Sequence, residues 1–247
     1  MTGFIDLHSH LLPGLDDGCV DVGESLACVR RLIEAGFVGT VCTSHMAVGF
    51  LPHVTPTAVA DGVARLRSVL ADEGIDYRLW TGGELRLGTE TPAWLDRHGV
   101  PTLGDGPYVL TDYWGDMGRG GDWPDACEET LDRLLADGYR PILAHPERMT
   151  HRDDDALDTL LDRLTAKGVL LQGNLKPLAG RDAPGTLERA TRYLSAGRYF
   201  TLAVDMHRPD SLEDRLAGID AVRTRAGDDA VRRLLAERPR EILGDVA

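Results

Sequence analysis

Short apolar runs recur along the chain at intervals that leave room for a helix between most neighbouring pairs. The runs are rich in Val, Leu, Ile, Ala and aromatic residues and show little alternation of polar and apolar positions, which is typical of strands buried on both faces. We predict seven such strands, at residues 3–7, 38–43, 77–82, 108–111, 141–144, 169–173 and 199–204.

Between these runs, apolar residues recur every three or four positions, as on the buried face of an amphipathic helix. The helical series are Leu26/Val29/Leu32/Ile33, Val59/Val63/Leu66/Leu70, Leu131/Leu134/Leu135 and Leu157/Leu160/Leu161/Leu164. Gly36, Gly138 and Gly168 stand where helices commonly end. This alternation favours an α/β fold whose parallel sheet closes into a barrel. No linker, repeat or composition shift divides the chain, so we expect a single domain over residues 1–247.

The charge balance argues against two classes of partner. The 247 residues include 27 Lys and Arg against 40 Asp and Glu, a formal net charge of −13, so no nucleic acid or anionic membrane is expected as a partner. No apolar run approaches the roughly 18 residues of a membrane span, and the first residues do not resemble a signal peptide. The four cysteines lack paired metal spacing and are expected to be reduced thiols. These features predict a cytoplasmic protein without membrane insertion, and they leave open whether it forms a homo-oligomer.

Residue types that bind metals occur at the carboxyl ends of nearly all the predicted strands. The position is significant because the active sites of parallel α/β barrels lie at that face. In chain order the strand-end residues are His8 with His10, His45, Glu84, Asp112, His145, Asn174, and Asp205 with His207. Asn174 is the exception among them, and the sequence leaves open whether it bonds a ligand or a water or is structural. Five of the eight histidines belong to this set, which chance explains poorly. A single histidine in such a place is more often structural, so the prediction depends on the whole set.

The spacing of the first and last pairs indicates a metal site. Side chains alternate along an extended segment, so His8 and His10 point to one face and can bind one ion, and the last pair repeats the arrangement. Imidazole and carboxylate ligands without thiolates suit Mn, with Fe or Zn as alternatives. With the Asp16-Asp17 pair added, the set exceeds what one ion needs. We therefore expect two or three divalent ions, and the choice between Asp16 and Asp17 as a ligand stays open.

Five segments carry a recognisable set of motifs. They are Ile5-Asp6-Leu7-His8-Ser9-His10 continuing to Asp16-Asp17-Gly18, then Thr43-Ser44-His45, Gly83-Glu84, Ala144-His145-Pro146-Glu147-Arg148 and Asp205-Met206-His207. In this order they resemble the polymerase-and-histidinol-phosphatase (PHP) superfamily, and within it the bacterial metal-dependent tyrosine-protein phosphatases of capsule and exopolysaccharide operons. The resemblance extends from residue 3 to about residue 245. It implies a distorted (β/α)7 TIM-like barrel with a trinuclear metal site.

The resemblance also implies which residues bind each ion. His8, His10, Glu84 and Asp205 would hold the first ion, Glu84 would bridge to a second held by Asp112 and His145, and the third would take Asp17, His45 and His207. Three features depart from the family. Asp112 stands where Glu is usual, Met46-Ala47-Val48-Gly49-Phe50 replaces a basic or polar stretch, and the loop 114–123 matches no familiar pattern. All three lie near the mouth of the expected site, so the reaction is better defined than the substrate.

The implied activity is hydrolysis of a phosphate monoester, with protein phosphotyrosine as the substrate. Clustered divalent ions lower the pKa of a bridging water and hold the oxygens of an in-line phosphoryl displacement. Arg148, in the His-Pro-Glu-Arg motif, can reach phosphoryl oxygens with its planar guanidinium, and Arg86 and Arg208 are weaker candidates. Arg148, Glu84 and His207 are therefore the candidate catalytic residues.

Other chemistries fit the sequence less well. Cys127 and Arg133 form a Cys-x5-Arg pattern, but the residues between them are acidic and lack the glycines of a thiolate phosphatase loop. Amidohydrolases often bridge their metals with a carboxylated lysine, and neither Lys167 nor Lys176 lies at a central strand end. A non-catalytic metal-binding regulator conflicts with the nearly complete ligand set. The main alternative is a PHP-type phosphatase of a small phosphate ester, such as histidinol phosphate or a biosynthetic intermediate.

Overall fold

The computed structural model describes residues 3–114, 123–149, 151 and 153–244, in which strands alternate with helices. The strands are β1 Phe4–Ser9, β2 Phe37–Cys42, β3 His45–Met46, β4 Arg78–Thr81, β5 Glu84–Arg86, β6 Tyr108–Asp112, β7 Arg140–Ala144, β8 Leu170–Asn174 and β9 Thr201–Ala203. The helices are α1 Val22–Glu34, α2 Pro56–Asp72, α3 Thr91–His98, α4 Asp125–Ala136, α5 Asp154–Lys167, α6 Leu175–Leu178, α7 Thr186–Ser195, α8 Pro209–Arg232 and α9 Arg238–Leu243. A 3-10 turn covers Pro146–Arg148, and a π-helical segment covers Arg233–Glu237.

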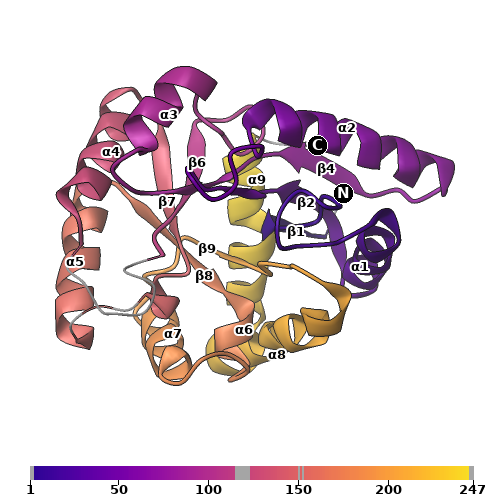
Figure 1. The fold of residues 1–247 in the computed structure, drawn as a ribbon. Helices are drawn as coiled ribbons and strands as arrows, with labels where there is room; N and C mark the ends of the chain where they lie inside the picture. The colour runs from indigo at the N-terminus through magenta and orange to yellow at the C-terminus, as the bar shows by residue number, and fades with distance from the viewer. Residues whose placement is uncertain (1–2, 115–122, 150, 152, 245–247) are drawn as a thin grey trace.

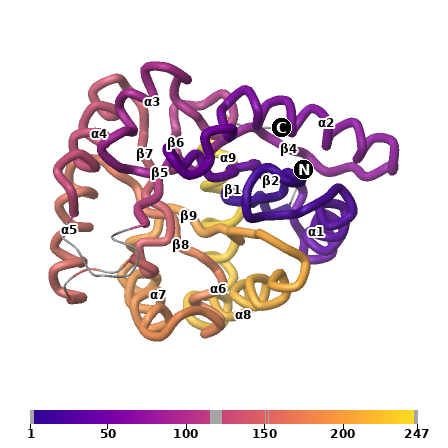
Figure 2. The backbone as a smooth tube through the Cα atoms, viewed as in Figure 1, coloured from indigo at the N-terminus to yellow at the C-terminus, as the bar shows by residue number. Residues whose placement is uncertain are grey.

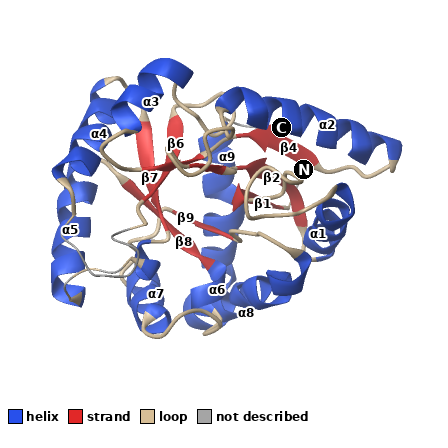
Figure 3. Cartoon of the chain, in the orientation of Figure 1, coloured by secondary structure: helices blue, strands red, loops and turns tan. Residues whose placement is uncertain are grey.

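The strands form two ladders in which every pair is parallel. One ladder has the order β1-β2-β4, and the other has the order β3-β5-β6-β7-β8-β9. Only two residues separate β2 from β3 and β4 from β5, so the second ladder continues the first. A single bridge joins Ser9 of β1 to Met206, and His10 N donates to Met206 O at 2.7 Å. These contacts bring the end of the second ladder beside the first strand of the first ladder, and we refer to the arrangement as the ring of strands. Figure 1 and Figure 3 show most of the helices around the strands, and the predicted α/β fold is confirmed.

Two of the predicted strands are each followed, after two residues, by a short strand that the apolar pattern did not predict, so the described residues contain nine strands rather than seven. As a result, His45 and Glu84 are the first residues of short strands and not the last residues of long ones. The two residues are paired in the register of β3 and β5. Between β4 and β5, a Cβ on Gly83 would lie 2.6 Å from Met46 Cε, so a larger residue would displace the Met46 side chain. The pairing of β3 with β5 keeps His45 and Glu84 side by side.

The helices begin and end with the expected local chemistry. Asp21 accepts a hydrogen bond from Glu24 N at 2.9 Å before α1, and Asp153 accepts one from Ala156 N at 2.8 Å before α5. The predicted glycines follow α1, α4 and α5 with positive φ angles: Gly36 at 93°, Gly138 at 88° and Gly168 at 108°. The four predicted helical series all lie on helices. The chain then returns to its start, because α9 packs on β1 and Arg240 donates to Gly3 O at 2.7 Å (Figure 2).

The apolar core consists of two clusters of buried side chains. A large cluster lies between helices and strands. A second cluster consists of Leu7, Val41, Leu103, Tyr108, Leu110, Ile142, Ala144 and Ile242. Leu170 and Phe200, at the amino ends of β8 and β9, pack against it together with Leu243 of α9. The second cluster therefore extends to apolar side chains at the amino ends of the strands.

We expect Gly218→Ala to destabilise the fold. A Cβ on this α8 glycine would overlap Leu175 O of α6, so the two helices would have to separate. Overpacking of this kind costs about 1–3 kcal/mol, which should lower the midpoint of urea unfolding. Gly88→Ala is the control, because the nearest atom to its Cβ would be Thr91 Oγ1 at 4.0 Å. Equal midpoints for the two variants would contradict the close packing of α6 and α8.

Candidate metal centre

The residues predicted from the strand ends surround a cavity of about 670 Å3. Its lining is formed by Asp17, His45, Phe50, Leu51, Glu84, Asp112, Tyr113, Trp114, His145, Arg148, Met149, Asp205 and His207. His8 and His10 are fully buried, and both contact Glu84 and Asp205 of the lining. The structure thus brings all nine predicted ligands together in one cluster.

The His-x-His pair presents two nitrogen atoms to the same point. His8 Nδ1 lies 2.9 Å from Gln172 Oε1, and His10 Nδ1 lies 2.7 Å from Asp16 Oδ2. Both partners are acceptors, so each ring carries its proton on Nδ1 and directs the lone pair of Nε2 inward. The two Nε2 atoms are 3.3 Å apart. Two lone pairs repel each other at that distance, so a proton or a cation between them fits this geometry.

Glu84 lies at the centre of the imidazoles. Its Oε1 is 3.3 Å from His8 Nε2 and 3.1 Å from His145 Nε2, while its Oε2 is 2.6 Å from His45 Nδ1 and 3.5 Å from His10 Nε2. Burial opposes its charge, but His8 and His45 hold the pKa of the carboxyl well below its ordinary value. Oε2 is buried and accepts no hydrogen bond of good geometry from the described residues. Such a carboxylate suits a position between two metal ions.

Asp205 connects the histidine pair to the cavity wall. Its Oδ1 is 3.5 Å from both His8 Nε2 and His10 Nε2. Its Oδ2 accepts hydrogen bonds from Arg148 at 3.1 Å and from Asn174 at 2.7 Å. Burial opposes ionisation, but His8 and His10 lower the pKa of Asp205 well below its ordinary value. An ionised carboxylate with one oxygen facing two imidazoles is a suitable metal ligand.

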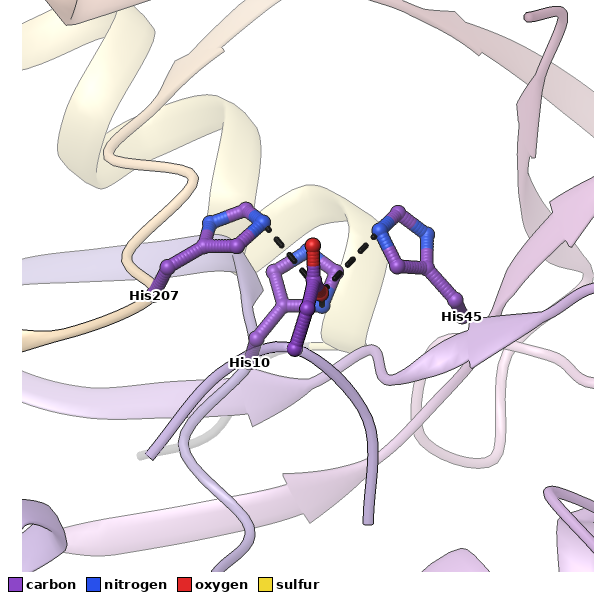
Figure 4. Close-up of side chains that lie close together, drawn as sticks. His10, His45 and His207 are labelled. Atoms are coloured by element: carbon purple, nitrogen blue, oxygen red, sulfur yellow. Dashed lines mark ion pairs between the residues drawn. The ribbon is translucent and has the colours of Figure 1, made fainter. Parts of the chain in front are cut away.

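A second group of ligands surrounds Asp17. Its Oδ1 is 3.4 Å from His45 Nε2 and 3.6 Å from His207 Nε2. Figure 4 shows the rings of His10, His45 and His207 close together, and donor atoms of these three residues and Asp17 lie within 4.8 Å of one another. Burial and the neighbouring His10 lower the pKa of His207 to about 4, so its ring stays neutral and able to bind a metal near pH 7.

Asp16 and Asp17 have different surroundings. Asp16 is enclosed by donors: besides His10, its carboxylate accepts from His45 N at 2.9 Å and from Gly18 N at 3.1 Å. Burial opposes its charge, but His10 lowers the pKa of Asp16. Asp17 faces the cavity with 65% of its side chain exposed. The glycine of the Asp-Asp-Gly motif is also explained, because a Cβ on Gly18 would overlap His10 O.

Asp112 and His145 complete the cluster. Donor atoms of Asp112, Glu84 and His45 lie within 4.8 Å of one another. His145 lies between the two carboxylates, with its Nδ1 3.9 Å from Asp112 Oδ1 and its Nε2 3.1 Å from Glu84 Oε1. Burial and the neighbouring Glu84 raise the pKa of Asp112. Burial would lower the pKa of His145, but Asp112 and Glu84 raise it to about 9. Two carboxylates this close disfavour each other's charge, and a cation between them would relieve the repulsion.

The sequence did not identify the residues that orient the ligands. Gln172 Nε2 donates to Asn174 Oδ1 at 2.8 Å, so a continuous chain of contacts runs from His8 through Gln172 and Asn174 to Asp205. Glu147 supports this chain by accepting from Asn174 N at 2.8 Å. The signal for Gln172 was present as one long polar residue inside the apolar run 169–173. Asn174, which the sequence left open, takes the positioning role.

The three candidate arginines have separate environments. Arg148 lines the cavity beside Asp205. Arg86 does not line it in the part of the chain that the structure describes, and its Cζ stacks on the rings of Phe50 and Trp114. Arg208 donates to Glu24 at 2.7 Å. Of the three, Arg148 alone is placed to meet a ligand in the cavity. Residues 115–122 of the unusual loop 114–123 lie outside the described residues.

The residues of the competing chemistries lie elsewhere. Cys127 is buried in α4, where burial raises the pKa of its thiol to about 12, and no phosphate-binding loop surrounds it among the described residues. Lys167, at the end of α5, forms ion pairs with Glu128 and Asp132. Lys176 is on α6 and does not line the cavity as described. The thiolate and carboxylated-lysine chemistries therefore lack support at this site.

Comparison with known proteins shows relatives along the whole chain. The sequence is 29% identical over 203 residues to the tyrosine-protein phosphatase YwqE of Bacillus subtilis, covering 82% of this chain and 77% of the relative. It is 26% identical over 251 residues to the tyrosine-protein phosphatase CpsB of Streptococcus pneumoniae, covering 98% of each. No helix in the described ranges is long and apolar enough to cross a membrane.

Solved structures agree with these relatives. A chain from the crystal structures of YwqE and CpsB, which are described as unique metal-dependent tyrosine phosphatases, matches with a TM-score of 0.83 at 25% identity, covering 98% of this chain and 94% of that one. The phosphotriesterase homology protein of Escherichia coli matches with a TM-score of 0.57 at 12% identity, covering 98% and 99%, and shares the fold alone. The profile of the capsular polysaccharide synthesis family CpsB/CapC matches residues 4–244, and the chain therefore belongs to that family.

Proposed function

We infer that this protein is a metal-dependent tyrosine-protein phosphatase. The observation that carries the inference is the buried cluster of imidazole and carboxylate groups at the carboxyl ends of the strands, with Arg148 beside it. The relatives named above have this activity in their names, and the family profile covers nearly the whole chain. The protein accordingly takes a phosphorylated tyrosine side chain of another protein as its substrate.

The site suits two or three divalent ions, for which we propose Mn2+. The donors are nitrogen and oxygen only, a set that suits Mn2+ and also accommodates Fe or Zn. The proposed ligands are His8, His10, Asp17, His45, Glu84, Asp112, His145, Asp205 and His207. A cytoplasmic location is part of the proposal, and the four unpaired cysteines support it, because disulfides form mainly in oxidising compartments.

The catalytic residues of the proposal are Arg148, Glu84 and His207. Divalent ions, when bound, supply an attacking hydroxide near neutral pH and Lewis acidity at the phosphoryl oxygens. Glu84 and His207, which both line the cavity, would hold those ions. Arg148 extends from the 3-10 turn after β7, and its guanidinium fork can meet the phosphoryl oxygens as charge develops on them. Asp205 holds Arg148 in this orientation through the 3.1 Å hydrogen bond.

Metal removal tests the function directly. We expect the protein loaded with Mn2+ to hydrolyse a phosphotyrosine peptide and p-nitrophenyl phosphate, and exhaustive chelation to abolish both activities. Glu84→Ala should have the same effect by a second route, because Glu84 contacts four imidazoles and would hold two ions. Metal analysis of both samples should show the loss. Turnover that survives chelation would refute the metal mechanism, and preference for small alkyl phosphates would favour the small-ester alternative.

Asp16→Asn should weaken metal binding without removing any proposed ligand. The neutral amide no longer stabilises the Nδ1 proton of His10, so the ring is held less firmly with Nε2 inward. Loss of such a supporting partner typically lowers metal affinity about 10–100-fold. The affinity is measured by Mn2+ titration calorimetry. Asp61→Asn, on the exposed face of α2, is the matched control. Identical Mn2+ affinities in the two variants would show that Asp16 does not support metal binding.

Arg148→Ala should lower kcat and kcat/KM together, because the lost contact strengthens in the transition state. Loss of one preorganised donor costs on the order of 10²-fold, about 3 kcal/mol. Arg148→Lys should recover little, since a point charge does not replace the guanidinium fork. Rates are measured at saturating Mn2+, because Arg148 also pairs with Asp205.

The control for this variant is Arg208→Ala, which removes an arginine that pairs with Glu24 outside the described cavity lining. It should keep the wild-type rate. Metal content and melting temperature should stay near wild type in Arg148→Ala. If that variant instead loses stability or metal while the remaining enzyme turns over normally, Arg148 has a structural role.

A further inference from the structure

The cavity has an apolar side that the proposed metal ligands do not use. Phe50, Leu51, Tyr113, Trp114 and Met149 line it. Phe50 keeps 55% of its surface exposed, the largest fraction among the large hydrophobic residues that the structure describes. Folding gains little from an aromatic ring left in water. Several apolar side chains grouped at a cavity, unlike a single exposed ring, are typical of a ligand-binding surface.

Two of these rings are held in place by one arginine. Arg86 Cζ lies 4.4 Å from the centroid of the Phe50 ring and 4.7 Å from that of the Trp114 ring. The rings themselves are 5.9 Å apart at an interplanar angle of 62°. Arg86 is absent from the cavity lining of the described residues, so it supports the rings from behind. The pair is therefore a preorganised surface.

This surface is in contact with His45, one of the proposed metal ligands. The Trp114 ring packs edge-on against His45, with centroids 5.2 Å apart at 83°. His45 Nδ1 is in turn 2.6 Å from Glu84 Oε2. The group attached to the ester oxygen of a bound phosphate would be the first to meet the two rings. In an aryl phosphate the ester oxygen carries a planar ring, whereas in an alkyl phosphate it carries a saturated carbon.

We propose that Phe50 and Trp114 form the subsite for the aromatic ring of an aryl phosphate monoester. The subsite selects phosphotyrosine over aliphatic phosphate esters. It rests on the proposed function, because the ring reaches this surface only when its phosphoryl group binds at the metal cluster. Aromatic rings attract one another edge to face or offset, so the pair favours a planar aryl group over an alkyl chain. Arg148, on the phosphoryl side, does not distinguish the two classes of ester.

The test compares two non-hydrolysable ligands, phenylphosphonate and methylphosphonate, by titration calorimetry of the protein loaded with Mn2+. Both share the phosphonate group, so the ratio of their dissociation constants isolates the contribution of the ring. The wild type should bind phenylphosphonate more tightly. Trp114→Ala and Phe50→Ala should each reduce this preference about tenfold and leave methylphosphonate binding within about twofold of wild type. Trp114→Phe should restore most of the preference.

Phe200→Ala is the matched control. Phe200 also lies under an arginine, with Arg238 Cζ 4.6 Å from its centroid, but it precedes β9 at the opposite end of the strands. The Phe200→Ala variant should prefer phenylphosphonate over methylphosphonate to the same extent as the wild type. The proposal is overturned by an unchanged preference in both cavity variants, or by loss of affinity for both phosphonates in equal measure. Selective phenylphosphonate binding without any turnover of phosphotyrosine would contradict the proposed function and leave the subsite intact.

Discussion

Glu84 presents a buried carboxylate to the imidazoles of His8, His10, His45 and His145, and the rest of the site is arranged around that contact. Removing a carboxylate from water costs several kcal/mol, on the order of the stability of a small domain, unless opposite charge or strong hydrogen bonds replace the water. Side chains from β1, β3 and the end of β7 supply that replacement together. The ring of strands is therefore what makes the charge tolerable, because it brings the three segments to one point.

A second layer decides which atoms face the centre. Gln172 and Asp16 occupy the outer nitrogens of His8 and His10, so the inner nitrogens carry lone pairs. Asn174 holds Asp205 in the same way, and Glu147 holds the backbone of Asn174. Each of these residues is buried, so none gains from exposure to water when its partner is lost. The hydrogen bonds of this layer therefore fix one tautomer of His8 and one of His10.

The sequence was sufficient for the main outline, since buried parallel strands appear as short apolar runs and their carboxyl ends meet at one face. The strand-end positions predicted eight of the nine proposed ligands at that face, whereas Asp17 was predicted only from the Asp16-Asp17 pair and the family resemblance. The sequence did not show that the short strands β3 and β5 begin at His45 and Glu84, because strands of two and three residues carry no apolar periodicity and depend on their pairing with each other. The role of Asp16 was equally hidden, since adjacent aspartates look alike until their hydrogen-bond partners are known.

The site also contains backbone strain, which destabilises the folded state. Among the described residues other than glycine, positive φ angles occur at His145, at 33°, and at Asp205, at 53°. Such conformations cost of order 1–3 kcal/mol each and persist where surrounding contacts enforce them. The proximity of Asp112 and Glu84 adds electrostatic repulsion, which also destabilises the folded state. Cations bound to the native state alone would offset both, since binding stabilises that state by mass action. The apolar cluster at the amino ends can then keep the fold together while the carboxyl ends keep a geometry suited to ions.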